Sequence, residues 1–534
     1  MRITLLLMLA CGTIFRFVAL GDKLYTNDEA TTSVHVSGHT IRDYLGAASA
    51  GRIRTMGDAM RFQSVDPHTT LKDVVTTLAV EDPQHPPLFY LLERGWQRLF
   101  GGSIVVRRSL SAVIGVLVIA AAYGFGLALL RSRRGAAILC ALVAVSPFHE
   151  LYAQQAREYA LWTLFILLSS ALLLRALEND APADWALYAL TAALGLYTDA
   201  LFLYALASQA AFVFLAYRSN RACVLRFAAA AGVAVVTFAP WLVVLYRGRG
   251  MVTNNAYFSA PLPADLFALK WLFNIGAVFF DLDYAYHATA VLLVPLLALV
   301  VAAWFVLCLR AERRIALFVC ALGALSVFAF VVPDVLRHES RSTSGRYLIP
   351  AWIACEAAVA FLILWLSARR SARTSATATV ALASLGVLGL ASSWVGMHHE
   401  YWWGDASVAP LGDIARAIER ADRPVSVVFD DDHPAWDFAP VELANVLPPD
   451  VGLVLLATGA PLPKTLGLTT KTLFALDPSR RFVERLAREG WHPELSYRFA
   501  TADPQLRALR SKAGAARAAA GVAEEPSSLW RLHR

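Results

Sequence analysis

"IVVRRSLSAVIGVLVIAAAYGFGLALLRSRR", residues 104–134, decides the class of fold. It is a long apolar run that ends in Arg131, Arg133 and Arg134, and a helix needs about 20 such residues to cross a bilayer. Similar runs recur along the 534-residue chain, which is 57% hydrophobic and 17% charged; soluble proteins average about 45–50% and about 25%. The mean hydropathy is +0.51. The sequence therefore predicts a mainly α, polytopic helical membrane protein.

Eleven apolar runs predict eleven spanning helices, and arginines predict how these helices are oriented. Clustered arginines in short connections mark the cytoplasmic side of a membrane, and with Arg2 also inside, an odd number of helices places the C-terminus outside. The arginine clusters lie in the connections 131–134, 218–221, 310–314 and 369–373. The expected helices are 3–21, 104–130, 135–152, 157–177, 183–199, 201–217, 223–246, 286–309, 313–333, 347–368 and 375–396.

Charge and cysteine content exclude two other classes of protein. The formal net charge is +7, but basic residues beside membrane helices set orientation, so we expect no nucleic-acid partner. All six cysteines lie in hydrophobic runs without metal-type spacing, so neither a disulfide framework nor a zinc site is expected. The first run resembles a signal peptide, but Arg16 interrupts it and many spans follow, so we expect it to be retained as a helix.

Two domains are expected. Residues 1–396 would hold the spanning helices together with a long first external loop, 22–103. From residue 397 strand-like and helix-like segments alternate, which predicts a small extracytoplasmic α/β domain over 397–534. Segments 85–102 and 265–280 have the pattern of amphipathic helices at the membrane surface, with a short span as the alternative for each.

Every polar constellation in the sequence falls on the predicted external face. Convergence of acids, bases and arginines from remote segments is unusual for simple loop solvation. The constellations are Asp28 and Glu29 after the first helix; Glu81, Asp82 and His85 before Pro86-Pro87; "SPFHELYAQQAREYAL" at 146–161; Asp199 at the end of a helix; and "TSGRYLIP" at 343–350.

Each of these groups also has a structural interpretation. Glu150, Gln154 and Arg157 would share one helix face if that helix starts early, with Glu158 pointing elsewhere. Arg157 would then either bind an anion or extend to lipid headgroups, and Arg346 has the same two interpretations. His85 alone favours a structural role before the two prolines. Glu81, Asp82 and His85, or the run Asp430-Asp431-Asp432-His433, could hold a metal, but neither has a strong metal-ligand spacing.

Five segments together resemble the GT-C membrane glycosyltransferases, in particular the glycosyltransferase family 39-like superfamily of protein O-mannosyltransferases and lipid A aminoarabinose transferases. They occur in the order found in that family, over roughly residues 5–370. Asp199 stands where many relatives have His, and Asn27 precedes the acidic pair where an aromatic residue is common. The segments are "FRFVALGDKLYTNDEATTSV", "HPPLFYLLERGWQRLFG", "SPFHELYAQQAREYAL", "LYTDALFL" and "GRYLIP".

The resemblance implies transfer of a sugar from a polyprenyl-phosphate donor to an acceptor hydroxyl. Its leaving group is a stable lipid phosphate anion, so one carboxylate suffices as base and cations are needed more than a general acid. The resemblance implies that Asp28 is that base and that Glu29 supports the loop or a metal. Arg157, His85 and Arg346 would bind the donor phosphate. The supporting residues would be Asp82, Gln154, Tyr159, Tyr347 and Asp199.

The remaining expectations concern partners and location. The acceptor would be a glycan, lipid or protein, and the sequence neither requires nor excludes a divalent metal. The enzyme would lie in the bacterial inner membrane with its active site outside. The alternative is a transporter or flippase of lipid-linked substrates without transferase activity, which should carry ionisable groups at mid-membrane depth.

Overall fold

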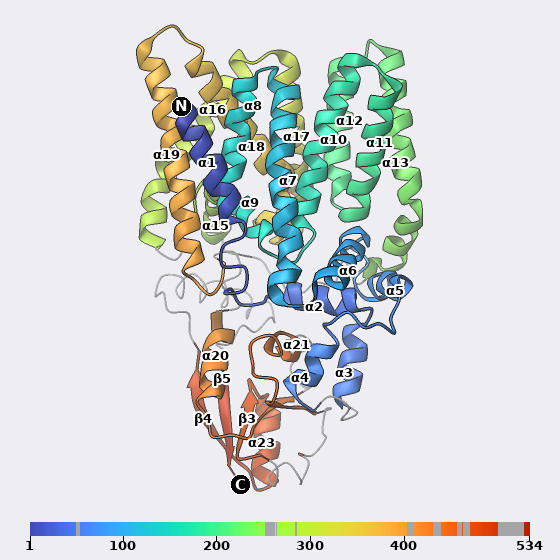
Figure 1. Ribbon diagram of the computed structural model, residues 1–534, viewed down its shortest axis with the longest axis vertical. Coiled ribbons are helices and arrows are strands. Elements are labelled where there is room, and N and C mark those ends of the chain that lie inside the picture. Colours follow the sequence, from blue (N-terminus) through green and yellow to red (C-terminus); the bar gives the residue numbers. More distant parts are fainter. Residues whose placement is uncertain are drawn as a thin grey trace.

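A bundle of long helices forms one end of the molecule and a small β-sheet forms the other (Figure 1). Short helices from the first loop lie between them. The structure is a computed structural model. It describes residues 1–49, 54–250, 262, 264–282, 286–402, 409–430, 439–456, 462, 470–499 and 528–533.

All eleven apolar runs that predicted spanning helices are helical. Among the described residues, seven helices are long and apolar enough to cross a membrane, or eight if the bent pair α8–α9 counts as one span; α1 and α12 are shorter apolar helices. The full count of eleven crossings therefore stays a prediction. The bundle helices are α1 Arg2–Phe15, α7 Ile104–Leu130, α8 Arg133–Val145, α9 Pro147–Ala153, α10 Tyr159–Asn179, α11 Pro182–Thr198, α12 Phe202–Tyr217, α13 Arg221–Arg247, α16 Tyr286–Arg310, α17 Arg313–Arg337, α18 Ile349–Ser367 and α19 Ala372–Met397.

One predicted helix was wrong in a way that matters for the site. The run 135–152 does not form a single helix, because α8 ends at Val145 and α9 begins at Pro147, with a bend of 62° between them. Proline is favoured in the first turn of a helix and disfavoured inside one. After α9 the chain leaves helical geometry again until Tyr159. The segment around Arg157 is therefore irregular backbone.

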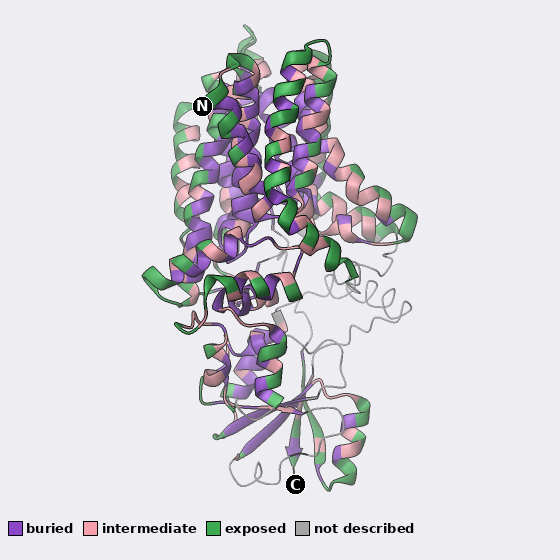
Figure 2. Ribbon diagram, turned by 90° about the vertical axis from the view of Figure 1, so that its right-hand side faces the viewer, coloured by how far each residue is buried: buried purple, intermediate pink, exposed green. Residues whose placement is uncertain are grey.

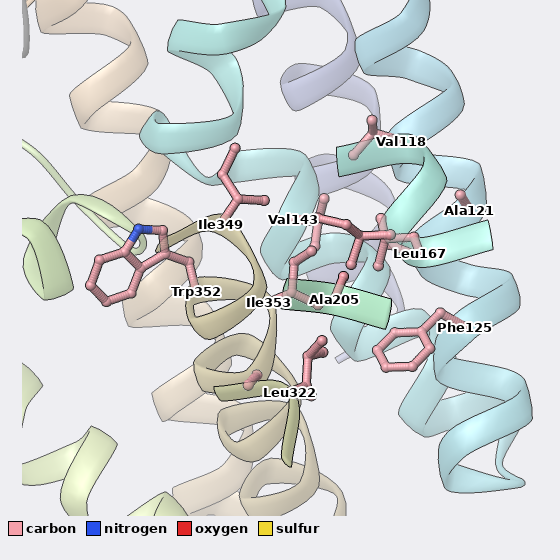
Figure 3. Close-up of a cluster of buried hydrophobic side chains, with 14 of the residues drawn as sticks. Val118, Ala121, Phe125, Val143, Leu167, Ala205, Leu322, Ile349, Trp352 and Ile353 are labelled. Carbon is pink, nitrogen blue, oxygen red and sulfur yellow. The ribbon is translucent and has the colours of Figure 1, made fainter. Parts of the chain in front are cut away.

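Apolar packing holds the bundle together. Side chains from α7, α8, α10, α12, α17 and α18 meet in one large cluster, part of which is shown in Figure 3. Buried residues fill the interior of the bundle, and exposed residues lie along its outer helices (Figure 2). Many of the exposed residues are large and apolar. Leu225, Val236 and Val291 are 69%, 71% and 73% exposed. Apolar surface of this extent marks contact with lipid or protein, as expected for a membrane-spanning bundle.

The C-terminal part contains the predicted α/β pattern. Its sheet has the strand order β2-β1-β3-β5-β4. Strand β1 pairs in parallel with β2 and β3, the central strand, and β5 pairs antiparallel with β3 and β4. The elements are β1 Val425–Asp430, β2 Gly452–Leu456, β3 Thr472–Leu476, β4 His492–Arg498 and β5 Ser528–His533, with α20 Ala409–Glu419, α21 Ala439–Leu443 and α23 Arg480–Arg488.

The first loop is folded, and its helices pack on both the bundle and the sheet. Tyr25, Val34 and Tyr44 share a buried apolar cluster with Val427 and Phe429 of β1. Helix α2 contacts α6 and α21, and α3 contacts β2. The proposed domain boundary at residue 397 thus runs across a packed interface. The loop helices are α2 Asn27–Ser37, α3 Ile41–Ser49, α4 Met56–Arg61, α5 Leu71–Glu81 and α6 Leu88–Phe100, and α15 Ala264–Ala277 covers the other predicted amphipathic segment.

Candidate active site

The two adjacent carboxylates at the start of α2, Asp28 and Glu29, point in different directions. Thr26 caps the helix: its hydroxyl accepts a hydrogen bond from the Glu29 N–H at 3.2 Å, and the Thr26 N–H donates to Glu29 Oε2 at 3.1 Å. This reciprocal capping box fixes Glu29 in the first turn. Asp28, one residue earlier, points away, and 41% of its side chain remains exposed.

Glu29 is fully buried and ties three segments together. The Arg108 guanidinium donates to both of its carboxylate oxygens, each at 2.7 Å. The Ala156 N–H donates to Glu29 Oε1 at 3.0 Å. These bonds join α2, α7 and the irregular segment before α10, and they leave Glu29 unable to reach a substrate.

Asp28 instead faces a cluster of cations. Arg346, in the 3-10 turn Gly345–Leu348 that precedes α18, donates from Nη1 to Asp28 Oδ2 at 2.6 Å. Burial opposes ionisation of Asp28, but Arg346, then Arg157 and His85, outweigh it and lower the pKa of Asp28 to about 2. Asp28 is therefore an ionised and partly accessible carboxylate.

Arg157 lies inside this cluster, with 3% exposure, and does not extend to the surface. It donates from Nη1 to the Thr32 hydroxyl at 2.7 Å and to Tyr90 Oη at 3.3 Å, and from Nη2 to Glu158 Oε1 at 3.1 Å. Among the described residues, its Nε, like that of Arg346, is buried with no hydrogen-bond partner. Burial lowers the pKa of Arg157, but Glu158 beside it more than compensates, so the side chain is charged.

His85 completes the cationic side of the cluster. Its Nδ1 lies 2.8 Å from Glu158 Oε1, and its Nε2 lies 3.8 Å from Asp82 Oδ2. Burial lowers the pKa of His85, but the two carboxylates outweigh it and raise that pKa to about 9. For Glu158, burial is likewise outweighed by Arg157 and His85, which lower its pKa to about 2.

The orientation expected for Glu158 was wrong. It is fully buried and braces both Arg157 and His85. The shared face of Glu150, Gln154 and Arg157 was also wrong, because α9 ends at Ala153. Gln154 donates to Phe15 O at 2.6 Å and to Val18 O at 2.9 Å, so it anchors the end of α1.

The other supporting residues divide between the site and its framework. The Tyr159 ring lies 5.5 Å from the Arg157 guanidinium carbon and 5.7 Å from that of Arg346, within cation–π range. Tyr347 stacks on Phe330 with ring centroids 5.4 Å apart. Asp199 caps a turn by accepting from the Leu201 N–H at 2.8 Å.

No metal site is formed by the described residues, since no three His, Cys, Asp or Glu side chains in the described part of the chain are placed to hold an ion. Glu81, one of the candidates, pairs with His35 at 3.1 Å and accepts from the Ile41 N–H at the start of α3. Residues 431–433 of the acidic run lie outside the described residues.

Two further buried pairs were not predicted from the sequence. One is Glu29–Arg108, whose arginine stands in "IVVRRS" at the start of α7. The other is His149–Glu356, 3.0 Å apart, with Glu356 fully buried inside α18. A lone carboxylate within an apolar run is itself a signal that a partner exists. This pair holds α9 against α18, and α9 leads into the irregular segment that carries Arg157.

Residues 84–246 match the family model described as dolichyl-phosphate-mannose-protein mannosyltransferase. Among solved structures, the chain is similar to ArnT from Cupriavidus metallidurans bound to undecaprenyl phosphate, with a TM-score of 0.55 and 14% identity over 98% of this chain and 97% of that one. For apo ArnT from that organism the TM-score is 0.51 and the identity 13%, with the same coverage. No curated protein matches the sequence. The resemblance to the GT-C superfamily and the fold that it implied are confirmed.

Proposed function

We propose that this protein is an integral membrane glycosyltransferase that moves a sugar from a polyprenyl-phosphate donor to an acceptor hydroxyl. The observation that carries the proposal is the accessible carboxylate of Asp28 beside Arg157, Arg346 and His85. A base next to three cations fits a reaction that removes a proton and releases a phosphate. The solved neighbour bound to undecaprenyl phosphate supports a donor of this class.

The step follows from the arrangement of these groups. The acceptor oxygen forms a bond to the anomeric carbon, the bond from that carbon to the phosphate oxygen breaks, and the acceptor proton passes to Asp28. The lipid phosphate leaves as an anion, held by charge-assisted hydrogen bonds from Arg157 and Arg346 and by protonated His85. Glu158 keeps Arg157 and His85 charged and oriented.

The ion pair between Asp28 and Arg346 implies that the donor binds before the acceptor reacts. While Arg346 holds Asp28, the carboxylate is a weak base, because its pKa is about 2. A donor phosphate competes for Arg346, whose Nε has no hydrogen-bond partner in the described part of the chain. Once Arg346 turns to the phosphate, the pKa of Asp28 rises and its basicity increases. Donor binding thus prepares the base, and the acceptor reacts second.

The proposed location is the outer face of a bacterial inner membrane, with the sheet domain over 397–534 outside. The arginine-rich connections lie at the opposite end of the bundle from the sheet, at the ends of α7, α12, α16 and α18 (Figure 1). Clustered arginines favour the cytoplasmic side, and this supports an external position for the Asp28 cluster.

A transporter is the competing function. A transporter is expected to carry ionisable groups within the bundle. Such groups are present here in the pair His149–Glu356 and in Arg16. These groups are paired, however: Arg16 donates to Gly12 O at 2.6 Å and Ala144 O at 2.7 Å. Such bonding supports a structural role for these groups.

Turnover by the purified protein tests the proposal. In detergent with a polyprenyl-phosphate sugar, a glycosyltransferase releases free lipid phosphate when an acceptor is added. Movement of the intact lipid-linked sugar across a proteoliposome membrane, without release of lipid phosphate, would identify a transporter instead.

A further inference from the structure

An open cavity lies where α6 ends and α7 begins. Its volume is about 510 Å³. It shares no residue with the Asp28 cluster, so it is a second polar site. The residues that line it are Ser64, Val65, Gln97, Arg98, Gly101 and Gly102.

Beside this cavity is a buried arginine with few partners. Arg107 is 1% exposed, and within the described chain its one hydrogen bond runs from Nη1 to Ser33 Oγ at 3.3 Å. Its Nε and Nη2 have no hydrogen-bond partner there. The next residue, Arg108, instead donates to both carboxylate oxygens of Glu29. The Nε–Nη2 edge of Arg107 is thus a fork of two donors, the arrangement that binds a carboxylate or phosphate.

The fork is directed at the cavity. A Cβ atom built on Gly102 would lie 3.9 Å from Arg107 Nη2 and 3.9 Å from Gln97 Oε1, so both atoms face a residue of the cavity wall. Gln97 is 5% exposed, and its Oε1 has no partner in the described part of the chain. A ligand at this place therefore meets two donors and one acceptor.

Glu93 is the acid that could neutralise Arg107 from within the protein. It accepts a hydrogen bond from Gln97 Nε2 at 2.8 Å. It has no hydrogen bond to Arg107, however, and burial raises the pKa of Glu93 to about 8, so its acid form predominates at neutral pH. The charge of Arg107 therefore remains available to an anion.

Other features near the cavity also favour an anion. Arg98 is exposed on the cavity wall and makes no ion pair with any described residue. Helix α7, 27 residues long, begins at Ile104, two residues after Gly102. The positive end of its dipole is thus next to the cavity.

Large apolar side chains flank the same turn. Leu99, Phe100 and Val105 are 77%, 58% and 48% exposed. Trp96 packs on Phe100 with ring centroids 4.5 Å apart. Helix α7 is long and apolar enough to cross a membrane, so its first turn lies near the membrane surface, where tryptophan is enriched. Such surroundings suit a lipid better than a soluble anion.

We propose that this cavity binds the headgroup of an anionic phospholipid. The fork of Arg107 holds the phosphate, Arg98 adds charge at the rim, and the acyl chains lie along the exposed apolar residues. Gly101 and Gly102 are both exposed, and a small shift of this turn brings the phosphate into contact with the fork. The site is independent of the proposed transferase function.

Two phospholipids that differ in net charge test the proposal. Full-length protein in detergent is titrated with phosphatidylglycerol, phosphatidylethanolamine or inorganic phosphate. Native mass spectrometry gives the affinity for the first bound lipid, and thermal unfolding gives the stabilisation. We expect phosphatidylglycerol to bind more tightly and to raise the unfolding temperature more than phosphatidylethanolamine. Inorganic phosphate should have little effect.

Substitutions locate the site. Charged hydrogen bonds of this kind correspond to roughly 10- to 150-fold in affinity, so Arg107→Gln should weaken phosphatidylglycerol binding by that factor. Arg98→Gln should weaken it by about 5-fold, the effect of one arginine near a lipid surface. The matched control is Arg61→Gln, since Arg61 is 82% exposed in the same loop and pairs with Asp58; it should bind as the wild type does.

Gly102→Glu keeps the test decisive if Arg107→Gln does not fold. A Cβ at this position makes only ordinary contacts, and the new carboxylate can pair with Arg107. This variant should lose at least about 10-fold in phosphatidylglycerol affinity while its lipid-free unfolding temperature does not fall.

The outcomes are distinct. Weaker phosphatidylglycerol binding in Gly102→Glu and Arg98→Gln, but not in Arg61→Gln, supports the proposal. Unchanged affinity in Gly102→Glu, or equal binding of the two phospholipids by the wild type, would overturn it. A stabilisation by inorganic phosphate as large as that by phosphatidylglycerol would identify a soluble anion and overturn the assignment to a lipid.

Discussion

Asp28 and Arg346, 318 positions apart in the sequence, form an ion pair of 2.6 Å between the first turn of α2 and the turn before α18. The pair joins the proposed base to a proposed ligand of the leaving phosphate. Neither residue is committed to the framework, since Asp28 is 41% exposed and Arg346 is 23% exposed at the side chain. Both are free to change partners when a substrate arrives.

Arg157 is the proposed phosphate ligand most deeply enclosed, so its geometry should matter as well as its charge. Lysine lacks the planar fork of arginine and would lose several of its bonds. Charged hydrogen bonds contribute about 1.5–3 kcal/mol, so Arg157→Lys should weaken donor use by roughly 10- to 150-fold. Arg157→Ala should weaken it more.

The dependence of turnover on donor concentration measures this effect, with membrane insertion as a control. An Arg157→Lys variant that matches the wild type at every donor concentration would remove Arg157 from the phosphate site.

Glu29 should behave differently from its neighbour. It is a buried carboxylate paired with Arg108, and removal of one partner of such a pair costs about 3–5 kcal/mol, since it leaves an unpaired buried charge. Glu29→Gln should therefore lower the thermal unfolding temperature in detergent strongly. Asp28→Asn should lower it less, because 41% of the Asp28 side chain is exposed and solvent weakens its ion pairs. An equal loss of stability in both variants would contradict the structural role of Glu29 and the catalytic role proposed for Asp28.

The raised pKa of His85 predicts that the free energy of unfolding depends on pH. Its pKa is raised from 6.5 to about 9, so the unfolded state loses its proton first as the pH rises. The stabilisation from Asp82 and Glu158 is fully present below about pH 6.5 and disappears as the pH passes through about 9.

Thermal unfolding of the wild type and of His85→Gln between pH 6 and pH 10 measures this. The difference between the two should be largest at low pH and should vanish near the upper end. A difference that stays constant over the range would exclude the charged form of His85.

Orientation can be tested independently of activity. In a cysteine-free background, single cysteines within 131–134 and 369–373 should be protected from an impermeant thiol reagent in intact spheroplasts. Cysteines in the described loop and sheet, for example at positions 72 and 480, should react. Protection of cysteines in the sheet would place the Asp28 cluster on the cytoplasmic side of the membrane and contradict the proposed orientation.

The sequence predicted the fold because its main signal is local. Each spanning run carries its own apolar pattern, so all eleven were found to be helical over most of their length, although 135–152 is divided between α8 and α9. The alternation of strands and helices after residue 397 was found in the same way. Local patterns did not predict that α2 and α3 would pack on the sheet, since that cluster combines residues about 400 positions apart, such as Tyr25 and Phe429.

The site was harder to predict, because its residues lie where regular structure ends. Helical spacing assigned Gln154 and Arg157 to one face, but the chain is irregular from Gln154 to Arg157, and backbone groups there bond to other segments, as the Ala156 N–H does to Glu29. The same irregularity turns Glu158 toward His85. Pro147 indicated where the regular helix would end, but it did not indicate the orientation of the side chains that follow.

The central claim is that Asp28 accepts the acceptor proton, and one comparison tests it most directly. Release of lipid phosphate from a polyprenyl-phosphate sugar is measured for purified wild type and Asp28→Asn, with binding of the donor lipid measured alongside. A positioned base contributes about 10²–10⁴-fold, so turnover should fall by that factor while the variant remains folded and still binds donor. Turnover of Asp28→Asn near the wild-type rate would contradict the account.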